Sequence, residues 1–161
     1  MIKYDGQAIW YLKERFTMED RILLILDGGE YVSSERSMAW GTIGRYLGCS
    51  DDEIDVLDKT LYKMVLNLGY LHGHHEPVVD IRTGRTWGAV PVYWISDSGR
   101  IFLQQRLIML YVETHKKNPP TPEEISRGLG IGEVSVTDRL TELIIEGKIT
   151  PAGPNTVRIP A

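Results

Sequence analysis

Apolar residues recur with helical spacing along the C-terminal half of the chain. Residues 101–115 contain enough of them for a mostly buried helix, and a shorter helix that follows would bury Ile125 and Leu129. A third helix is expected over 133–146. Its apolar face consists of Val136, Leu140, Leu143 and Ile144. Two extended pieces, KIT and TVRIP, flank the turn residues PAGPN and predict a β-hairpin.

Capping residues mark the ends of these helices. Thr121 can accept a hydrogen bond from a first-turn amide, Pro122 needs no donor at that position, and Glu124 completes a capping box. Gly130 can supply the positive φ of a tight turn, and Gly147 ends the last helix. Helix, helix, turn, helix and hairpin is the order of a winged helix-turn-helix.

The N-terminal half follows the same plan. Apolar spacing predicts helices over Met18–Leu26 and Met38–Leu47, and a capping box of Ser50 and Glu53 opens a longer helix. The residues of that helix expected to face inward are Ile54, Leu57, Leu61, Val65 and Leu68. A strand then begins at Tyr70.

A long hairpin is expected after this strand. We interpret residues 72–76 as a polar loop, VVDI and WGAVPVYWI as the two arms of the hairpin, and RTGR as its tip. The aromatic residues of the second arm, Trp87, Tyr93 and Trp94, are interpreted as packing residues.

The predicted fold class is therefore α+β, mainly α with small β-hairpins, arranged as two winged helix-turn-helix units in tandem. The first unit spans 17–99 and has a long wing, and the second spans 100–161. Residues 1–16 are expected to form an N-terminal extension or docking helix.

Both halves resemble known DNA-binding families. EEISRGLGIGEVSVTDRLTELIIEGKI resembles the N-terminal DNA-binding domain of the LexA repressor and related bacterial winged-helix regulators. LYKMVLNLGYL, the hairpin after it and YWISDSGR resemble the recognition helix, wing and post-wing strand of MarR-like and PadR-like regulators. The resemblance covers most of 17–160 and implies a protein that binds double-stranded DNA.

The LexA-like pattern implies which side chains face the bases. They are Val134, Ser135, Thr137 and Asp138. Hydroxyls can contact several base edges, valine can meet a thymine methyl, and aspartate can accept from the cytosine amine. Arg139 would reach guanine or a phosphate, with support from Lys148, Asn155 and Arg158 on the small hairpin. The alternative interpretation is an ordinary solvated helix face.

The first unit carries opposite charges at its two ends. Arg82 and Arg85 lie at the hairpin tip, where wings enter a narrow minor groove. The helix over 51–68 instead opens with five carboxylates in eight residues. Those carboxylates would oppose phosphates, so this helix is expected to face solvent or a basic protein partner.

Composition narrows the function further. The net charge of -4 arises in residues 1–99, because from residue 100 onward eight Lys or Arg face seven Asp or Glu. No apolar run approaches the roughly 18 residues that a membrane span needs, so no membrane partner is expected. The single Cys49 excludes an intramolecular disulfide and a zinc–thiolate cluster, which favours a cytoplasmic location.

No catalytic arrangement is evident in the sequence. His72, His74, His75 and Glu76 lack an obvious fourth metal ligand, and Cys49 has no evident base. We therefore expect no metal, no cofactor and no enzymatic activity.

The leading hypothesis is a sequence-specific DNA-binding protein, a prokaryotic or phage transcription regulator. A homodimer is expected, with the outward Ile145 as one candidate contact. The alternatives are a plasmid or phage replication initiator, and a protein-interaction adaptor similar to acidic accessory subunits of chromosome-condensation complexes.

Overall fold

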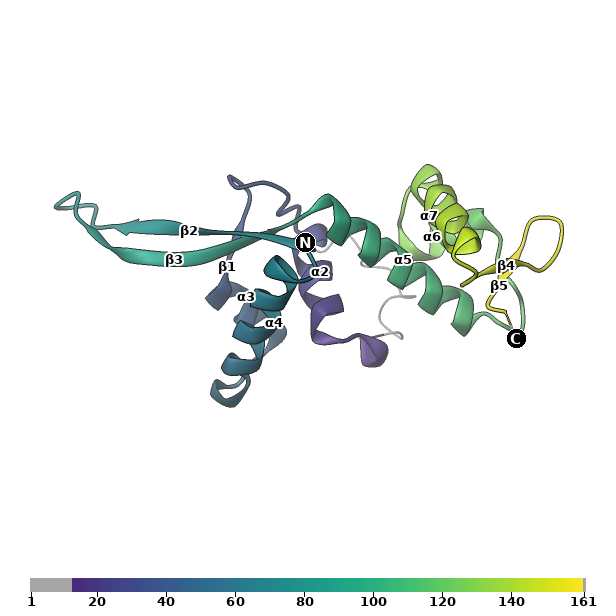
Figure 1. Cartoon of the computed structure of the whole chain (residues 1–161), viewed down its shortest axis with the longest axis horizontal. Coiled ribbons are helices and arrows are strands. Elements are labelled where there is room, and N and C mark those ends of the chain that lie inside the picture. The colour runs from purple at the N-terminus through teal and green to yellow at the C-terminus, as the bar shows by residue number, and fades with distance from the viewer. Residues whose placement is uncertain (1–12, 161) are drawn as a thin grey trace. The chain divides into compact units, whose positions relative to one another are not determined.

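The computed structural model describes residues 13–160, which form two compact units (Figure 1). Unit 1 contains Thr17–Arg100, and unit 2 contains 13–16 and 101–160. Both units combine helices with antiparallel strands, so the predicted α+β class is confirmed. Of the predicted N-terminal extension, 1–12 lie outside the described residues, and Lys13–Arg15 form the short 3-10 helix η1.

Unit 1 is a group of helices with a three-stranded antiparallel sheet. Its elements are α2 (Met18–Gly28), β1 (Met38–Ala39), α3 (Trp40–Leu47), η2 (Asp51–Glu53), α4 (Ile54–Leu66), β2 (Leu71–Val79) and β3 (Thr86–Ile95). The strand order is β1-β3-β2. The fully buried side chains of the three α-helices are Ile22, Leu23, Leu26, Ile43, Leu57, Leu61 and Met64.

The helix starts of unit 1 follow the predicted capping chemistry. The Thr17 hydroxyl accepts the Asp20 amide at 3.2 Å, and the Asp20 carboxylate accepts the Thr17 amide at 3.0 Å. Ser50 and Glu53 form the second capping box. Gly48, at φ 70°, ends α3 in the left-handed region that glycine tolerates best.

Two helix predictions for unit 1 need correction. The helix predicted from Met38 begins at Trp40, because Met38 and Ala39 form strand β1 and pair with β3. In α4, Leu57 and Leu61 are buried as predicted, but Leu68 lies beyond the helix end and is 36% exposed.

The inner face of α4 is completed by residues that the apolar pattern did not select. Thr60 and Met64 are buried, whereas Ile54 and Val65 are only half-buried. The buried hydroxyl of Thr60 is satisfied by donating to the Val56 carbonyl at 2.7 Å.

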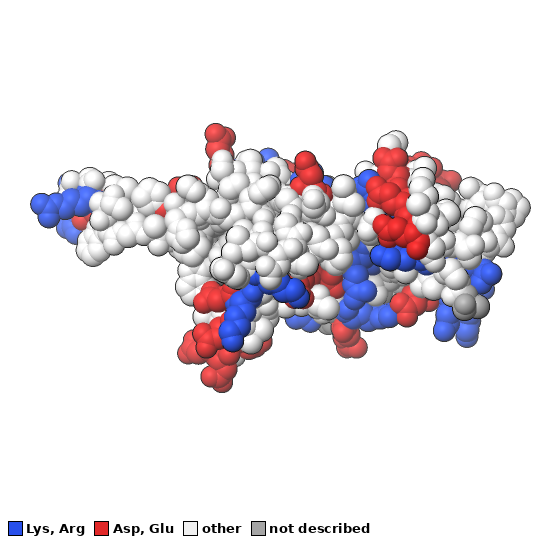
Figure 2. Space-filling view, viewed as in Figure 1, with Lys and Arg blue, Asp and Glu red and all other residues white. Residues whose placement is uncertain are grey.

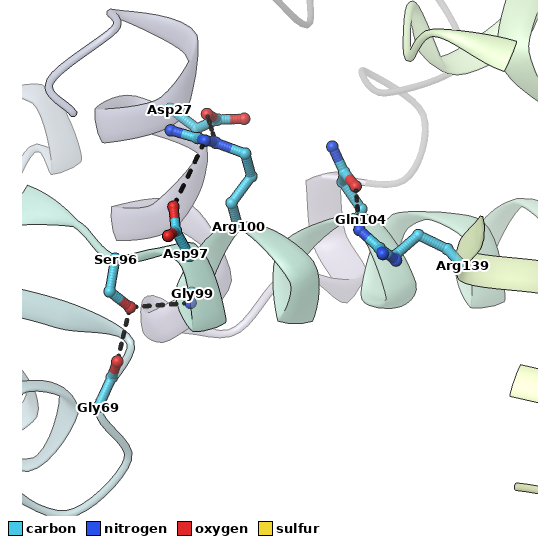
Figure 3. Close-up of polar contacts among 8 residues, drawn as sticks. All are labelled: Asp27, Gly69, Ser96, Asp97, Gly99, Arg100, Gln104 and Arg139. Atoms are coloured by element: carbon cyan, nitrogen blue, oxygen red, sulfur yellow. Dashed lines mark hydrogen bonds and ion pairs between the residues drawn. The ribbon is translucent and has the colours of Figure 1, made fainter. Parts of the chain in front are cut away.

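A buried serine connects the end of β3 to the helix that follows. The Ser96 hydroxyl donates to the Gly69 carbonyl at 2.6 Å and accepts the Gly99 amide at 3.0 Å (Figure 3). One residue later, Arg100 donates to the buried carboxylate of Asp27 on α2 at 3.0 Å. These contacts join both ends of the β2–β3 hairpin to the helices of unit 1.

The β2–β3 hairpin is much longer than the part of it that packs. β1 pairs only with Val92 and Tyr93 of β3. Residues 75–91, called the arm below, therefore form a ribbon of only two strands joined by a turn. None of its side chains is buried. In Figure 1 the arm extends away from α3 and α4 of its own unit.

Unit 2 is built from three helices and a small hairpin. Its elements are α5 (Asp97–Thr114, of which 101–114 belong to this unit), α6 (Pro122–Leu129), α7 (Glu133–Ile145), β4 (Thr150–Pro151) and β5 (Val157–Arg158). Ile125, Leu129, Val136, Leu140 and Leu143 are buried as predicted. Ile144, predicted to lie on the same face, is 38% exposed, because it lies at the edge of the face formed by Val136, Leu140 and Leu143.

The turns of unit 2 also follow the sequence signals. Thr121 and Glu124 form the predicted capping box, and Gly130 adopts φ 71°. The chain before α6 meets the hairpin where the Val157 amide donates to the Pro120 carbonyl at 3.1 Å. Among the residues that the structure describes, no helix combines the length and the apolar character needed to cross a membrane.

Gly99 provides a test of how tightly the base of the hairpin is packed. A Cβ at this position would collide with the backbone carbonyl oxygen of Tyr70, which cannot swing away. We predict that Gly99→Ala lowers the free energy of unfolding by about 2 kcal/mol, as overpacking of a core does. Urea unfolding followed by circular dichroism measures this.

Gly41→Ala is the matched control. Gly41 lies within α3 with nothing within 4 Å of an added Cβ, so alanine there should be neutral or stabilise by up to about 1 kcal/mol. Equal stabilities for the two variants would contradict the packing described for Gly99.

Candidate nucleic-acid interface

The tip of the arm is an ordered turn. The Asp80 amide donates to the Arg85 carbonyl at 2.8 Å, and the Gly84 amide donates to the Asp80 carbonyl at 2.7 Å. The Asp80 carboxylate accepts the Arg82 amide at 2.8 Å, and Gly84 adopts φ 68°. The backbone of the turn is therefore fixed by its own hydrogen bonds.

Both arginines of this turn are exposed and lack an acidic partner within the described part of the chain. Arg36, Arg127 and Arg139, in contrast, each form an ion pair. Figure 2 shows the basic side chains at the far end of the hairpin, with little acidic surface around them. Arg82 and Arg85 thus present uncompensated charge, as an anion-binding site requires.

The same tip exposes apolar side chains that the sequence analysis did not select as functional. Ile81 is 99% exposed and Trp87 is 76% exposed. The prediction that Trp87 packs is therefore wrong, whereas Tyr93 and Trp94 are half-buried. Together with Val78 and Val79, Ile81 and Trp87 line a shallow, open groove, which Asp80 and Arg82 also line.

Trp87 lies at a β-bulge on an arm that has no core on either face. Val78 pairs with Gly88 and Val79 with Thr86, so Trp87 is an extra residue on its strand. Gly88 adopts φ 149°, a conformation that side chains disfavour. Bulges redirect side chains, and this one lies beside the turn. The Trp-Gly pair that follows RTGR after one threonine, Thr86, was the sequence signal for it.

The histidines lie on a strand rather than in the predicted loop. Residues 72–76 pair with 90–94 throughout, because polar side chains are compatible with a ribbon that is solvated on both faces. His72 contacts the Trp94 ring with a centroid separation of 5.5 Å. Within 13–160 no group of three potential ligands is close enough to hold a metal ion.

The predicted base-facing residues of α7 are placed together on its outer side. Val134 is 78% exposed, Thr137 and Asp138 are also exposed, and Ser135 is half-buried. The Thr137 hydroxyl donates to the Glu133 carbonyl at 3.0 Å within the same helix. This surface carries two carboxylates, from Glu133 and Asp138.

Arg139, by contrast, is held inside unit 2. Its guanidinium donates to both carboxylate oxygens of Glu142, at 2.9 and 2.8 Å, and to the Gln104 side chain at 3.1 Å (Figure 3). Gln105 donates to the same Glu142 carboxylate at 2.7 Å. The Arg139 side chain is only 15% exposed, so its contacts join α7 to α5.

The small hairpin offers less cationic surface than the sequence indicated. Lys148 forms an ion pair with Glu146 at 3.0 Å. Asn155 and Arg158 are exposed, as the prediction required. These groups are a weaker candidate for phosphate contact than the arm tip.

The segment formed by η2 and the first turns of α4 is acidic and exposed. The acidic residues there are Asp51, Asp52, Glu53, Asp55 and Asp58. Hydrogen bonds from the backbone and side chain of Ser50 lower the pKa of Glu53, which keeps this capping carboxylate charged. Nearby Cys49 has a raised pKa because of burial and the charge of Glu53, and this disfavours a reactive thiolate.

No family model matches the chain, and no curated protein is significantly similar to it. The case for function therefore rests on the geometry and charge of the surfaces described above.

The contacts of Arg139 predict a structural role. Arg139→Ala should lower the stability of unit 2 by about 1–2 kcal/mol, because it leaves the Glu142 carboxylate without its bidentate partner. The control is Arg127→Ala, which removes an exposed pair with Glu123 and should cost about 0.5 kcal/mol or less. Hydrogen exchange of α7 amides measures both, and equal effects would contradict the role.

The same contacts predict a pH dependence. The Arg139 hydrogen bonds, aided by Gln105, lower the pKa of Glu142 against the opposing effect of desolvation. A lowered carboxyl pKa adds stability above its ordinary value of about 4.3, and that stability is lost as the pH falls through the folded-state pKa.

Glu142→Gln should therefore flatten the decline in stability between about pH 5 and pH 3. Glu123→Gln, which alters an exposed pair, should retain the wild-type slope. Denaturation midpoints across this range are the measurement, and an unchanged slope for Glu142→Gln would refute the prediction.

Proposed function

We propose that the protein binds double-stranded DNA through the tip of the arm. The observation that carries the proposal is the pair of exposed, unpaired arginines, Arg82 and Arg85, on an ordered turn. Uncompensated guanidinium groups on a projecting turn can approach phosphates closely while the body of the unit stays outside the groove.

We further propose that each unit is a winged helix-turn-helix. In unit 1, β1 precedes α3 and pairs with β3, and the β2–β3 hairpin follows α4. In unit 2, α6 and α7 are joined by a glycine turn and followed by the β4–β5 hairpin. The arm then corresponds to the wing of the first unit.

Within this proposal, α7 is the base-reading candidate. Val134, Thr137 and Asp138 present a methyl surface, a hydroxyl and a carboxylate, which suit thymine, several base edges and cytosine respectively. Arg139 is hydrogen-bonded to Glu142 and Gln104 and is not free to bind phosphate. In this proposal α7 therefore contributes sequence preference, and most of the affinity comes from the arm. A transcription regulator acting as a homodimer fits this division, since two arms and two reading helices would engage paired half-sites.

The second candidate function is a protein-interaction adaptor. Its support is the set of exposed apolar side chains along α4, where Val56 near the acidic start is 52% exposed, and Tyr62 and Leu66 further along the helix are 66% and 61% exposed. A basic, partly apolar protein surface would complement it. The arm itself is less suited to strand addition, because Pro77 and Pro91 remove backbone donors from its strands.

Binding to mixed-sequence duplex DNA at several salt concentrations tests the proposal. We predict measurable affinity at low salt that weakens as the salt concentration rises, because phosphate binding releases counterions. Arg82→Gln/Arg85→Gln should reduce the magnitude of the salt slope by about two and weaken binding across all sequences.

The matched control is Lys59→Gln/Arg127→Gln, which also removes two exposed positive charges but away from the arm. It should bind DNA as the wild type does. If the wild type shows no binding at low salt while its circular dichroism is native, the DNA proposal fails. Equal losses in the two double variants would show a general charge effect and reject the arm as the contact.

A further inference from the structure

We propose that Ile81 is a wedge that enters the DNA minor groove, partly separates a base step and bends the duplex. This inference rests on the proposed DNA binding and adds to it a mechanical function. It concerns an apolar residue, whereas the proposed binding rests on the two arginines.

The first observation is the exposure of Ile81 on a fixed backbone. Its side chain is 99% exposed in a turn held by the Asp80–Arg85 and Gly84–Asp80 hydrogen bonds. An isoleucine in this position contributes almost nothing to the core of unit 1. A rigid turn also presents the side chain without a further loss of backbone entropy on binding.

The second observation is the apolar surface behind Ile81. Val78, Val79 and Trp87 line the same groove, together with Asp80 and Arg82, and Trp87 is the extra residue of the bulge beside Gly88. Contiguous exposed apolar side chains of this kind commonly mark an interaction site. The walls of a minor groove are deoxyribose edges, against which these side chains can pack.

The third observation is charge. Arg82 follows Ile81 directly, and Arg85 lies across the same turn, both without an acidic partner in the described chain. Ile81 follows Asp80 and precedes Arg82, so the turn carries one carboxylate and two guanidinium groups beside the apolar side chain. When the apolar side chain enters the groove, the guanidinium groups can bind the flanking phosphates and stabilise the opened step. Minor-groove proteins that bend DNA combine an inserted apolar side chain with arginines in this manner.

The apolar side chains and the arginines together favour duplex DNA as the partner of the arm tip. Bending the duplex costs free energy, which new protein–DNA contacts must offset. In this proposal, the apolar side chains and the arginines of the tip gain those contacts when the minor groove widens around the turn. An anionic lipid surface would also accept tryptophan and arginine, so it is included as an arm of the test.

End-labelled duplexes of about 30 base pairs, shorter than the persistence length of DNA, report bending by energy transfer. Saturating wild-type protein should raise the transfer between the ends. The Ile81→Ala variant should bind the duplex about threefold to tenfold more weakly. At a concentration that saturates the duplex, this variant should leave the energy transfer between the labelled ends near that of free DNA. The control Leu66→Ala, which removes an apolar side chain that is 61% exposed on α4, should behave as the wild type.

A duplex with a central two-nucleotide gap provides the second readout. A gap supplies flexibility in advance, so the wild type should bind it about fivefold more tightly than the intact duplex. Ile81→Ala should lose most of this preference. Because Ile81 makes little contact with the fold, its variant should remain folded, which circular dichroism verifies.

The outcomes separate the two proposals. Wild-type binding with unchanged energy transfer, or transfer unaffected by Ile81→Ala, overturns the wedge while DNA binding stands. Absence of any wild-type binding at low salt overturns the DNA proposal itself. Binding to vesicles of phosphatidylserine that exceeds binding to DNA and depends on Ile81 assigns the tip to a membrane surface and overturns the wedge.

Discussion

The contacts at the base of the β2–β3 hairpin are the constraint on which the proposed function depends. The arm over 75–91 has no buried side chain, and an isolated two-stranded ribbon is only marginally stable in water. Its orientation must therefore be set where it joins unit 1. The Ser96 hydroxyl bridges Gly69 and Gly99 across the two ends of the hairpin, and Arg100 reaches the buried Asp27 carboxylate. Ser96 and Asp27 are almost fully buried, so these hydrogen bonds form away from water, where they are stronger, and they fix the base of the hairpin.

The distribution of charge makes the arm tip a better surface for phosphates than α4 or α7. α4 begins with exposed carboxylates, and the outer side of α7 carries Glu133 and Asp138. The one arginine on α7 is bound to Glu142 and Gln104. An acidic body with a cationic, apolar projection would disfavour non-specific coating of DNA while allowing a local contact at the tip. The net charge of -4 is compatible with this arrangement.

The sequence predicted the helices well because their ends are specified locally. The Thr121–Glu124 capping box, the glycine turn at Gly130 and the buried faces of α6 and α7 depend on short-range spacing, and the structure has them with the exception of Ile144, which is exposed. It failed where a distant partner decides the outcome. Strand β1 exists only because Met38 and Ala39 meet β3, and His72–Glu76 become strand because their partners on β3 are in register. Arg82 and Arg85 were placed at the turn by its motif, whereas Trp87 was misjudged because an apolar residue normally packs and the arm has no core on either face. The burial of Arg139 was missed because Gln104 is brought to it from α5 by the fold, whereas its other partner, Glu142, is three residues away on the same helix.

The most direct test of the central claim is a chemical-shift titration of the isotope-labelled chain with duplex DNA. The account predicts that the largest amide shifts fall on Ile81, Arg82, Gly84 and Arg85, with smaller shifts on the outer side of α7 and none at the start of α4. Shifts confined to α4 or α7, with the amides of the arm tip unchanged at saturation, would contradict it.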